Sequence, residues 1–422
     1  MKFLRIGICA LIVFGVAAHG AVEDWARAVL EIGAALLFCS WAVRAYFKQE
    51  RQLVISPLLL PLVCLLLIAL AQWVFHITAS SYGTRMELQL LLADILILFL
   101  AAQAFRTLED WRGFVWFGMS FGFVVALFGI LQHLTFNGKL YWFREMHFGG
   151  IPFGPYANRN HFAGFAELVI PISLVPLILG KVRRERWFLV SLFAVVPIAA
   201  LFLAASRGGI VSFAVELGVL VLWLLLRRTA GKHLLSGGAV LLLAFLMVSW
   251  LGVEQIVERF SSLQSLEVTA GKRASMRADT WHIFLEHPWM GTGLGTLQVV
   301  FPRYETLYDG KIVNHTHNDY LEGLAETGIA GGLCCIWFLG VLLFDSLRRL
   351  SQSNGSFVSA LQLSGLVACI GFLTHSLVDF NLHIPANAVL FFFMANLATS
   401  EIRQLAPRIP ESEPIHHRPR NH

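Results

Sequence analysis

Two histidines precede a long apolar stretch in the C-terminal third of the chain. His315, His317 and Asn318 lead into an apolar run over residues 319–345. An imidazole placed where a helix enters a membrane can take a proton from a hydroxyl group, because its ordinary pKa is about 6.5. We therefore interpret His317 as a candidate general base, with His315 and Asn318 as candidate substrate-binding residues. A solvated surface histidine is the alternative interpretation.

Arg207 lies between two apolar runs, in the sequence Ser206-Arg207-Gly208-Gly209. A charged side chain is costly in hydrocarbon unless it faces water, a counter-ion or a cavity, so an arginine here is a candidate functional residue. Its guanidinium can bind two oxygens of a phosphate group through parallel hydrogen bonds, which lysine cannot do. The alternative is an arginine that only extends its charged end to the membrane interface.

Two further arginines and a tryptophan recur every four residues: Arg273, Arg277 and Trp281. This spacing places them on one face of a predicted helix. The arginines could bind an anion, and Trp281 could lie at the membrane interface or against a sugar ring. Residues 291–295 read Gly-Thr-Gly-Leu-Gly but lack the Lys-Ser/Thr ending of a nucleotide-binding loop. We interpret them as a flexible segment or a place of close backbone approach.

A polar stretch also opens the sixth apolar run. Asn158, Arg159 and Asn160 directly precede it. Asparagine is common as the residue that caps a helix, so these side chains either line a binding site or only cap the helix. We include all three as candidate substrate-binding residues.

His375, Asp379 and His383 recur at the spacing that metal ligands use on a helix. Pro385 follows closely, however, so the helix is expected to end before His383. The six cysteines all lie in apolar runs without a C-x-x-C pair, which argues against a thiolate-bound metal and against disulfides. Because paired arginines can neutralise a pyrophosphate, we expect no metal ion and no cofactor.

The composition requires a membrane around these residues. Of the 422 residues, 57% are hydrophobic and only 14% are charged, and the mean hydropathy is +0.67. A soluble domain could not cover so much apolar surface, and long apolar runs without a ten-residue alternation favour helices over a barrel. Most soluble enzyme classes are therefore excluded. The net charge of +5 lies on no basic soluble domain, so we expect no nucleic acid partner.

The apolar runs predict an all-α polytopic protein with about twelve transmembrane helices. The runs cover roughly residues 4–20, 27–47, 53–76, 87–105, 113–133, 162–180, 187–205, 209–226, 234–252, 319–345, 357–377 and 386–400. Most of the 32 lysines and arginines fall in cytoplasmic segments if both termini are cytoplasmic. Alternatively, the first run is a cleaved signal peptide, which leaves eleven helices.

Two segments on the opposite side of the membrane are too long to be simple turns. They cover residues 134–161 and 253–318, and the second is expected to be partly helical. Basic residues kept on this side indicate an anionic ligand, although ordinary solvated charge accounts for part of them. The tail, residues 407–422, is rich in Pro, His and Arg and is predicted to be disordered.

The motifs together resemble a known family. One pattern is similar to a signature of the O-antigen ligases and the related O-antigen polymerases: His317-Asn318, a nine-residue spacer and then Gly328-x-x-Gly331. Arg207 stands in a Ser-Arg-Gly-Gly setting that the family shares, and Arg277 matches its second functional arginine. From the residues alone, we expect the two glycines to allow close packing between helices.

The resemblance implies a GT-C-like glycosyltransferase domain over residues 1–406, in the bacterial inner membrane, with its site facing the periplasm. The implied donor is a glycan on undecaprenyl pyrophosphate, and the implied acceptor is a hydroxyl of lipid A-core or of another glycan. The membrane lipid around the helices is a further expected partner. Arg207 and Arg277 would hold the pyrophosphate, and His317 would activate the hydroxyl, with inversion at the anomeric carbon.

Three alternatives stay open. An O-antigen or exopolysaccharide polymerase would use the same donor with a lipid-linked glycan as acceptor. An oligosaccharyltransferase acting on protein hydroxyls is possible, although its relatives usually have a longer C-terminal extension. A membrane transporter or flippase would use the intramembrane carboxylates of Asp94, Glu167 and Glu216 for ion coupling.

Overall fold

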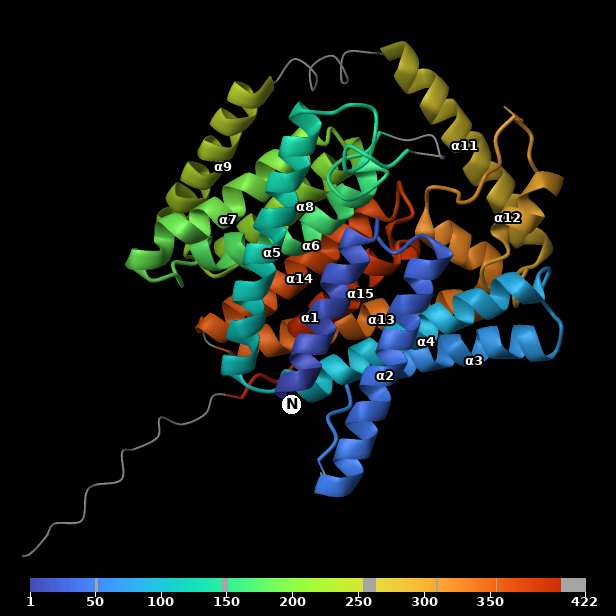
Figure 1. Cartoon of the computed structure of the whole chain (residues 1–422), viewed down its shortest axis with the longest axis horizontal. Coiled ribbons are helices and arrows are strands. Elements are labelled where there is room, and N and C mark those ends of the chain that lie inside the picture. The colour runs from blue at the N-terminus through green and yellow to red at the C-terminus, as the bar shows by residue number, and fades with distance from the viewer. Residues whose placement is uncertain (50–51, 146–150, 253–262, 309, 354, 404–422) are drawn as a thin grey trace, which may run out of the picture.

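The computed structural model describes residues 1–49, 52–145, 151–252, 263–308, 310–353 and 355–403. Within these ranges the chain is helical and contains no named strand (Figure 1). The predicted all-α polytopic fold is confirmed. The predicted disordered tail, residues 407–422, lies outside the described residues, as do parts of both long segments, 146–150 and 253–262.

Each of the twelve apolar runs coincides with a helix. These helices are α1 Lys2–Ala17, α2 Asp24–Lys48, α3 Leu59–Val74, α4 Ser81–Ala104, α5 Leu108–Leu134, α6 Arg159–Ile178, α7 Arg184–Leu203, α8 Arg207–Leu226, α9 Ala230–Gly252, α13 Asp319–Gln352, α14 Phe357–His375 and α15 Pro385–Thr399. Among the described residues, eight are long and apolar enough to cross a membrane: α2, α4, α5, α6, α7, α8, α13 and α14. The apolar parts of α3, α9 and α15 are shorter.

Helices α6 and α14 form the centre of the bundle. Every α6 residue from His161 to Ile178 is buried, and α14 packs against α6, α8 and α15. Large apolar side chains on outer helices are exposed instead, for example Leu36 of α2 and Leu226 of α8. Exposed leucines are expected where a helix faces lipid rather than water. The most enclosed helices are therefore those whose ends form the site described below.

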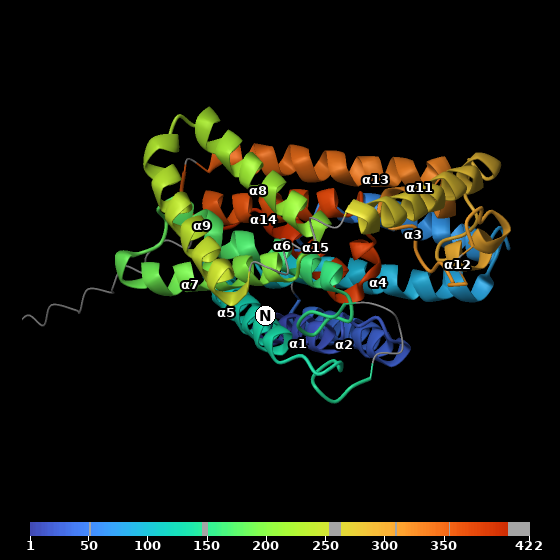
Figure 2. The same ribbon diagram turned by 90° about the horizontal axis from the view of Figure 1, so that it is seen from above.

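The second long segment is partly helical, as predicted. It contains α11 Leu263–Glu286, the short α12 Leu297–Val300 and the 3-10 helix η1 Phe301–Arg303. Figure 2 shows α11 lying alongside α13, and the two helices pack together. A separate small core holds this region, and it includes Ile283 of α11 and Phe301 of η1. Arg273 and Arg277 are thus carried on a packed helix.

Candidate active site

The candidate site surrounds residues 376–380, which follow the end of α14 at His375. The next element is the 3-10 helix η2, Asn381–His383. His375, Asp379 and His383 therefore do not share one helical face, in agreement with the expected end of the helix before His383. The backbone N–H of Asp319, the first residue of α13, donates to the carbonyl of Ser376 at 3.0 Å, so the start of α13 is fixed to this segment.

Asp379 is the buried centre of the site. Its Oδ1 accepts hydrogen bonds from His317 Nδ1 at 2.9 Å and from the Phe380 N–H at 3.0 Å, and its Oδ2 accepts one from Asn160 Nδ2 at 2.5 Å. Burial alone would raise the pKa of Asp379, but the hydrogen bond from His317 and the positive charge that His317, His161 and His375 carry when protonated hold this pKa below its ordinary value. The carboxylate is thus ionised.

The hydrogen bond to Asp379 determines what His317 can do. An ionised carboxylate only accepts hydrogen bonds, so the shared proton lies on Nδ1. In the neutral form of the ring, the lone pair is then on Nε2. The His317 side chain is 24% exposed, so a substrate can reach it. The arrangement is that of an imidazole base oriented by a buried acid.

The backbone turns sharply at His317. Its φ of +53° lies in the left-handed region, which non-glycine residues seldom adopt. Asn318 then caps α13, because its Oδ1 accepts a hydrogen bond from the Leu321 N–H at 3.0 Å. The amide oxygen of Asn318 is therefore engaged in the helix cap rather than directed at a ligand.

Arg207 begins α8 beside residues 376–380. Ser206 caps this helix by accepting from the Gly209 N–H at 3.2 Å. A Cβ on Gly208 would lie 2.6 Å from His375 Nε2 and 3.0 Å from a Val378 methyl, so glycine is what allows this close approach. The start of α8, with Arg207, is thereby packed against the segment that carries Asp379.

His375 and Glu167 form a buried pair close to the start of α8. His375 Nδ1 is 2.9 Å from Glu167 Oε1, and both side chains are buried, His375 at the end of α14 and Glu167 in the middle of α6. A Cβ on Gly209 would lie 2.6 Å from Ala163 Cβ and 3.4 Å from Glu167 Oε1. Glu167, considered above as an ion-coupling carboxylate, therefore has a defined partner in the wall of the site.

Helix α11 carries two arginines, and the first of them contacts the same segment. Arg273 Nη1 donates to the Val378 carbonyl at 3.2 Å. Arg277 follows one turn later, and its buried Nε has no hydrogen-bond partner among the described residues. Burial and then the nearby charge of Arg273 lower the pKa of Arg277. Trp281 is 45% exposed, so its ring is available to a ligand or to lipid.

The three candidates at the start of α6 have different roles. Asn158 caps the helix by accepting from the Asn160 N–H at 2.9 Å, whereas the Asn160 side chain binds Asp379. The Arg159 backbone N–H donates to the Ile151 carbonyl at 2.8 Å. Of the two alternatives given above, capping describes Asn158, while Asn160 belongs to the site itself.

The glycine-rich residues 291–295 bind a carboxylate of the protein. The N–H groups of Gly295 and Leu297 donate to the two oxygens of buried Glu326 at 2.8 and 2.9 Å. A Cβ on Gly291, whose φ is +66°, would lie 2.2 Å from the Glu326 backbone. Of the two interpretations, close backbone approach is therefore the one found here.

Gly328 has a different role from the one expected. It was predicted to allow close packing between helices, but its φ of +64° and ψ of −164° kink α13. A Cβ there would lie 2.4 Å from the Trp289 carbonyl carbon. Beyond the kink, the Ile329 N–H donates to the Pro288 carbonyl at 2.8 Å. The kink thus docks the turn after α11 onto α13.

Two functional candidates were not assigned their roles from the sequence. Asp379 was considered only for its metal-like spacing, and Glu322 was given no role. Glu322 Oε1 lies 2.7 Å from His315 Nδ1, so this buried carboxylate accounts for the position of His315. An ionised side chain one turn into an apolar helix costs free energy unless it is paired. The position of Glu322 in the sequence could therefore have indicated a paired, functional carboxylate.

Comparison with known families gives one match. Residues 192–336 match the family described as O-antigen ligase. This segment includes Arg207, Arg277 and His317, and the match confirms the resemblance inferred from their motifs. The chain is therefore similar to the O-antigen ligases over this segment, and its apolar helices are those of a membrane protein. A comparison with curated proteins found no match to the chain.

Proposed function

We propose that this chain, with its O-antigen ligase segment at residues 192–336, transfers a glycan from undecaprenyl pyrophosphate to a hydroxyl of lipid A-core. The observation that carries the proposal is the hydrogen bond from His317 to buried, ionised Asp379, in a segment that also contacts α8 and α11. A base and cationic groups beside one segment are what transfer from a pyrophosphate donor requires.

The reaction begins with the acceptor hydroxyl. Its proton passes to Nε2 of His317 while its oxygen attacks the anomeric carbon of the donor, on the side opposite the pyrophosphate. The bond between the anomeric carbon and the pyrophosphate oxygen breaks, and its electron pair leaves with the lipid pyrophosphate. The configuration is therefore inverted. Asp379 stabilises the imidazolium, which then releases its proton to water.

The arginines act on the leaving group. Negative charge grows on the pyrophosphate as the glycosidic bond breaks, and guanidinium groups held in place stabilise it without rearranging. The buried Nε of Arg277 supports this assignment, because an anion would supply the hydrogen bond it lacks within the described residues. Arg207 is assigned the other side of the pyrophosphate. Arg273 bonds to the backbone at Val378 and supports the binding surface.

The remaining assignments concern the setting of the enzyme. We place it in the bacterial inner membrane with both termini in the cytoplasm and the site facing the periplasm. The unequal distribution of lysine and arginine supports this orientation. His315, Asn158, Arg159 and Trp281 are assigned to the surroundings of the site, without a direct step in the reaction.

Purified protein tests the proposal in detergent, where no ion gradient exists. Undecaprenyl-pyrophosphate glycan is supplied with lipid A-core, or alone so that only lipid-linked glycan can accept. Transfer to lipid A-core that is lost in His317→Ala, but kept in the control His282→Ala on exposed α11 surface, supports the ligase. Elongation of lipid-linked glycan alone would identify a polymerase, and no transfer to either acceptor would overturn the proposal.

A further inference from the structure

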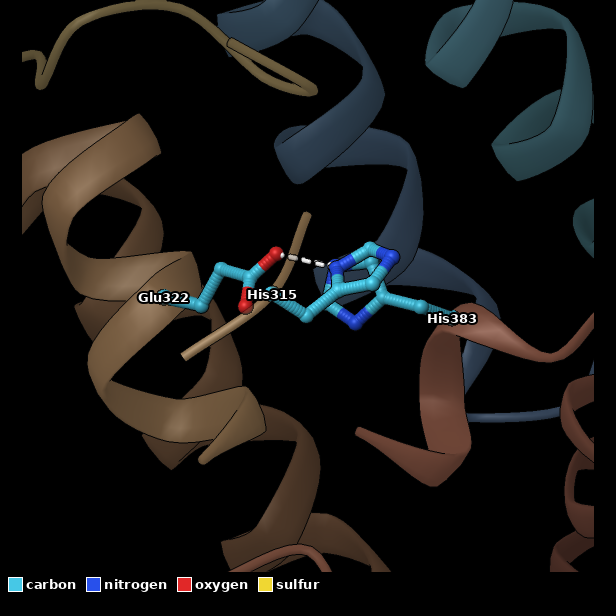
Figure 3. Close-up of side chains that lie close together, drawn as sticks. All are labelled: His315, Glu322 and His383. Atoms are coloured by element: carbon cyan, nitrogen blue, oxygen red, sulfur yellow. Dashed lines mark hydrogen bonds and ion pairs between the residues drawn. The ribbon is translucent and has the colours of Figure 1, made fainter. Parts of the chain in front are cut away.

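A second group of side chains lies beside the proposed base. His315 precedes α13, Glu322 lies one turn into α13, and His383 ends η2; we call these three residues the His315 cluster. Figure 3 shows the three side chains pointing toward one another from these separate elements. One ligand atom from each lies within 4.8 Å of the others. Three potential metal ligands thus meet at one point.

The spacing of these atoms is that of a metal's ligand set. Glu322 Oε1 lies 2.7 Å from His315 Nδ1 and 3.4 Å from His383 Nε2. Around a tetrahedral ion with bonds of about 2.0–2.1 Å, ligand atoms stand roughly 3.3 Å apart. These two distances lie close to that spacing, and the third pair of ligand atoms lies within 4.8 Å, so small movements of the side chains would accommodate an ion. The ion would replace the proton between His315 and Glu322.

The surroundings hold the ligand atoms in the orientation that metal binding needs. His383 Nδ1 is 2.7 Å from Asp319 Oδ1, which directs Nε2 of the same ring toward Glu322. The Asp319 carboxylate is itself held by the Leu382 N–H at 3.0 Å, and Glu322 Oε2 by the Thr316 N–H at 2.9 Å. A carboxylate behind a metal-binding histidine is the usual arrangement at zinc sites.

We propose that His315, Glu322 and His383 bind one divalent transition-metal ion, with Zn²⁺ as the preferred species. Two imidazoles and one carboxylate suit Zn²⁺, whereas Mg²⁺ and Ca²⁺ prefer oxygen ligands. The His315 and His383 side chains are 28% and 21% exposed, so an ion can enter and keep a water molecule as its fourth ligand.

The ion would join the parts of the chain that present the proposed base and its acid. Phe380 stacks on the ring of His315 at 4.4 Å and lies edge-on to the ring of His317 at 5.0 Å. The ring of Phe380 would thus lie between the metal site and His317. By binding His315 and His383, the ion would hold together the segment that precedes α13 and the segment that follows α14. The inference rests on the His315 cluster alone and does not depend on the proposed glycan transfer.

Metal binding is measured on full-length protein purified without a polyhistidine tag. His416 and His417 of the tail are replaced by alanine in every sample, so that adventitious binding there is removed. After bound metal has been removed with a chelator, titration with Zn²⁺ should show one tightly bound ion per protein molecule and the release of protons. Co²⁺ should give the visible absorption of a tetrahedral site. Absence of a tight equivalent in this parent protein overturns the proposal.

Variants locate the ion. His383→Gln should lose the tight equivalent and the Co²⁺ absorption, whereas His282→Gln, on the exposed surface of α11, should keep both. Asp319→Asn should bind roughly 10–100-fold more weakly, the usual effect of changing a residue that orients a ligand. Unchanged affinity in both His383→Gln and Asp319→Asn would show that the cluster is only a hydrogen-bonded network. Should His383→Gln fail to fold, the Asp319→Asn titration decides alone.

Discussion

His317 Nδ1 lies 2.9 Å from Asp379 Oδ1, although the two residues are 62 positions apart in the sequence. His317 lies just before α13 and Asp379 lies just after α14, so the contact depends on how these two helices pack together. Asn160 of a third helix, α6, holds the other oxygen of the carboxylate. The tertiary structure therefore orients the proposed base, and a change at any of the three helix ends would alter the orientation of the His317 ring.

Arg277→Lys tests whether the guanidinium binds the pyrophosphate. Lysine keeps the charge but cannot form two parallel hydrogen bonds, so we expect kcat/KM for the lipid-linked donor to fall roughly 10–100-fold, which corresponds to about 1.5–3 kcal/mol. Steady-state transfer assays measure this. Arg303→Lys, at an exposed position of η1, is the matched control. Equal values of kcat/KM for the two variants would contradict the role of Arg277 in binding the pyrophosphate.

Gly328→Ala tests the kink in α13. Its φ of +64° and the Trp289 backbone 2.4 Å from a Cβ leave no room for a side chain, so we expect a loss of about 1–3 kcal/mol in the free energy of unfolding. Gly340→Ala is the control in the same helix, because nothing lies within 4 Å of its Cβ. Thermal unfolding in detergent should show a lower Tm only for Gly328→Ala; similar Tm values would argue against the kink.

His19 gives the protein a pH-dependent stability. Burial lowers the pKa of His19, and the charge of Arg144 lowers it further, against a hydrogen bond to the Pro155 carbonyl. Between this lowered pKa and the ordinary value of about 6.5, the unfolded chain binds more protons, so stability falls as the pH drops below about 6.5. The stability is fully present above that value.

The variant His19→Gln isolates this effect. Glutamine can still donate to the Pro155 carbonyl but does not titrate, so the Tm difference between wild type and variant should shrink from pH 7.5 to pH 5.5. Other histidines contribute equally to both proteins and cancel in the difference. A Tm difference that stays constant over this pH range would contradict the expected titration.

Local features of the site could be read from the sequence, because they depend on spacing along one element. Apolar run length placed all twelve helices, and four-residue spacing placed Arg273, Arg277 and Trp281 on one predicted helix that α11 contains. The apolar run predicted over residues 319–345 lies in α13, which begins at Asp319. Helix periodicity and helix starts are short-range properties, so the chain itself determines them.

Contacts between helix ends could not be read in this way. No pattern within residues 376–383 indicates that Asp379 binds His317 or that His383 meets Glu322, because both contacts depend on the packing of α13 against α14 and η2. The spacing of His375, Asp379 and His383 fits one helical face, but Pro385 predicted an end of the helix before His383, and α14 does end at His375. The Gly328 kink was likewise hidden, since its cause is the turn at Trp289.

The most direct test of the account is a double-mutant cycle on His317 and Asp379 in purified protein. Asp379→Asn preserves the shape of the side chain but removes the charge that orients and stabilises the imidazole, so we expect kcat for glycan transfer to fall about 10²–10⁴-fold. His317→Ala should fall at least as far. Because the two residues act as one unit, the double variant should be no slower than His317→Ala. Full activity in Asp379→Asn, or losses that multiply in the double variant, would contradict the account.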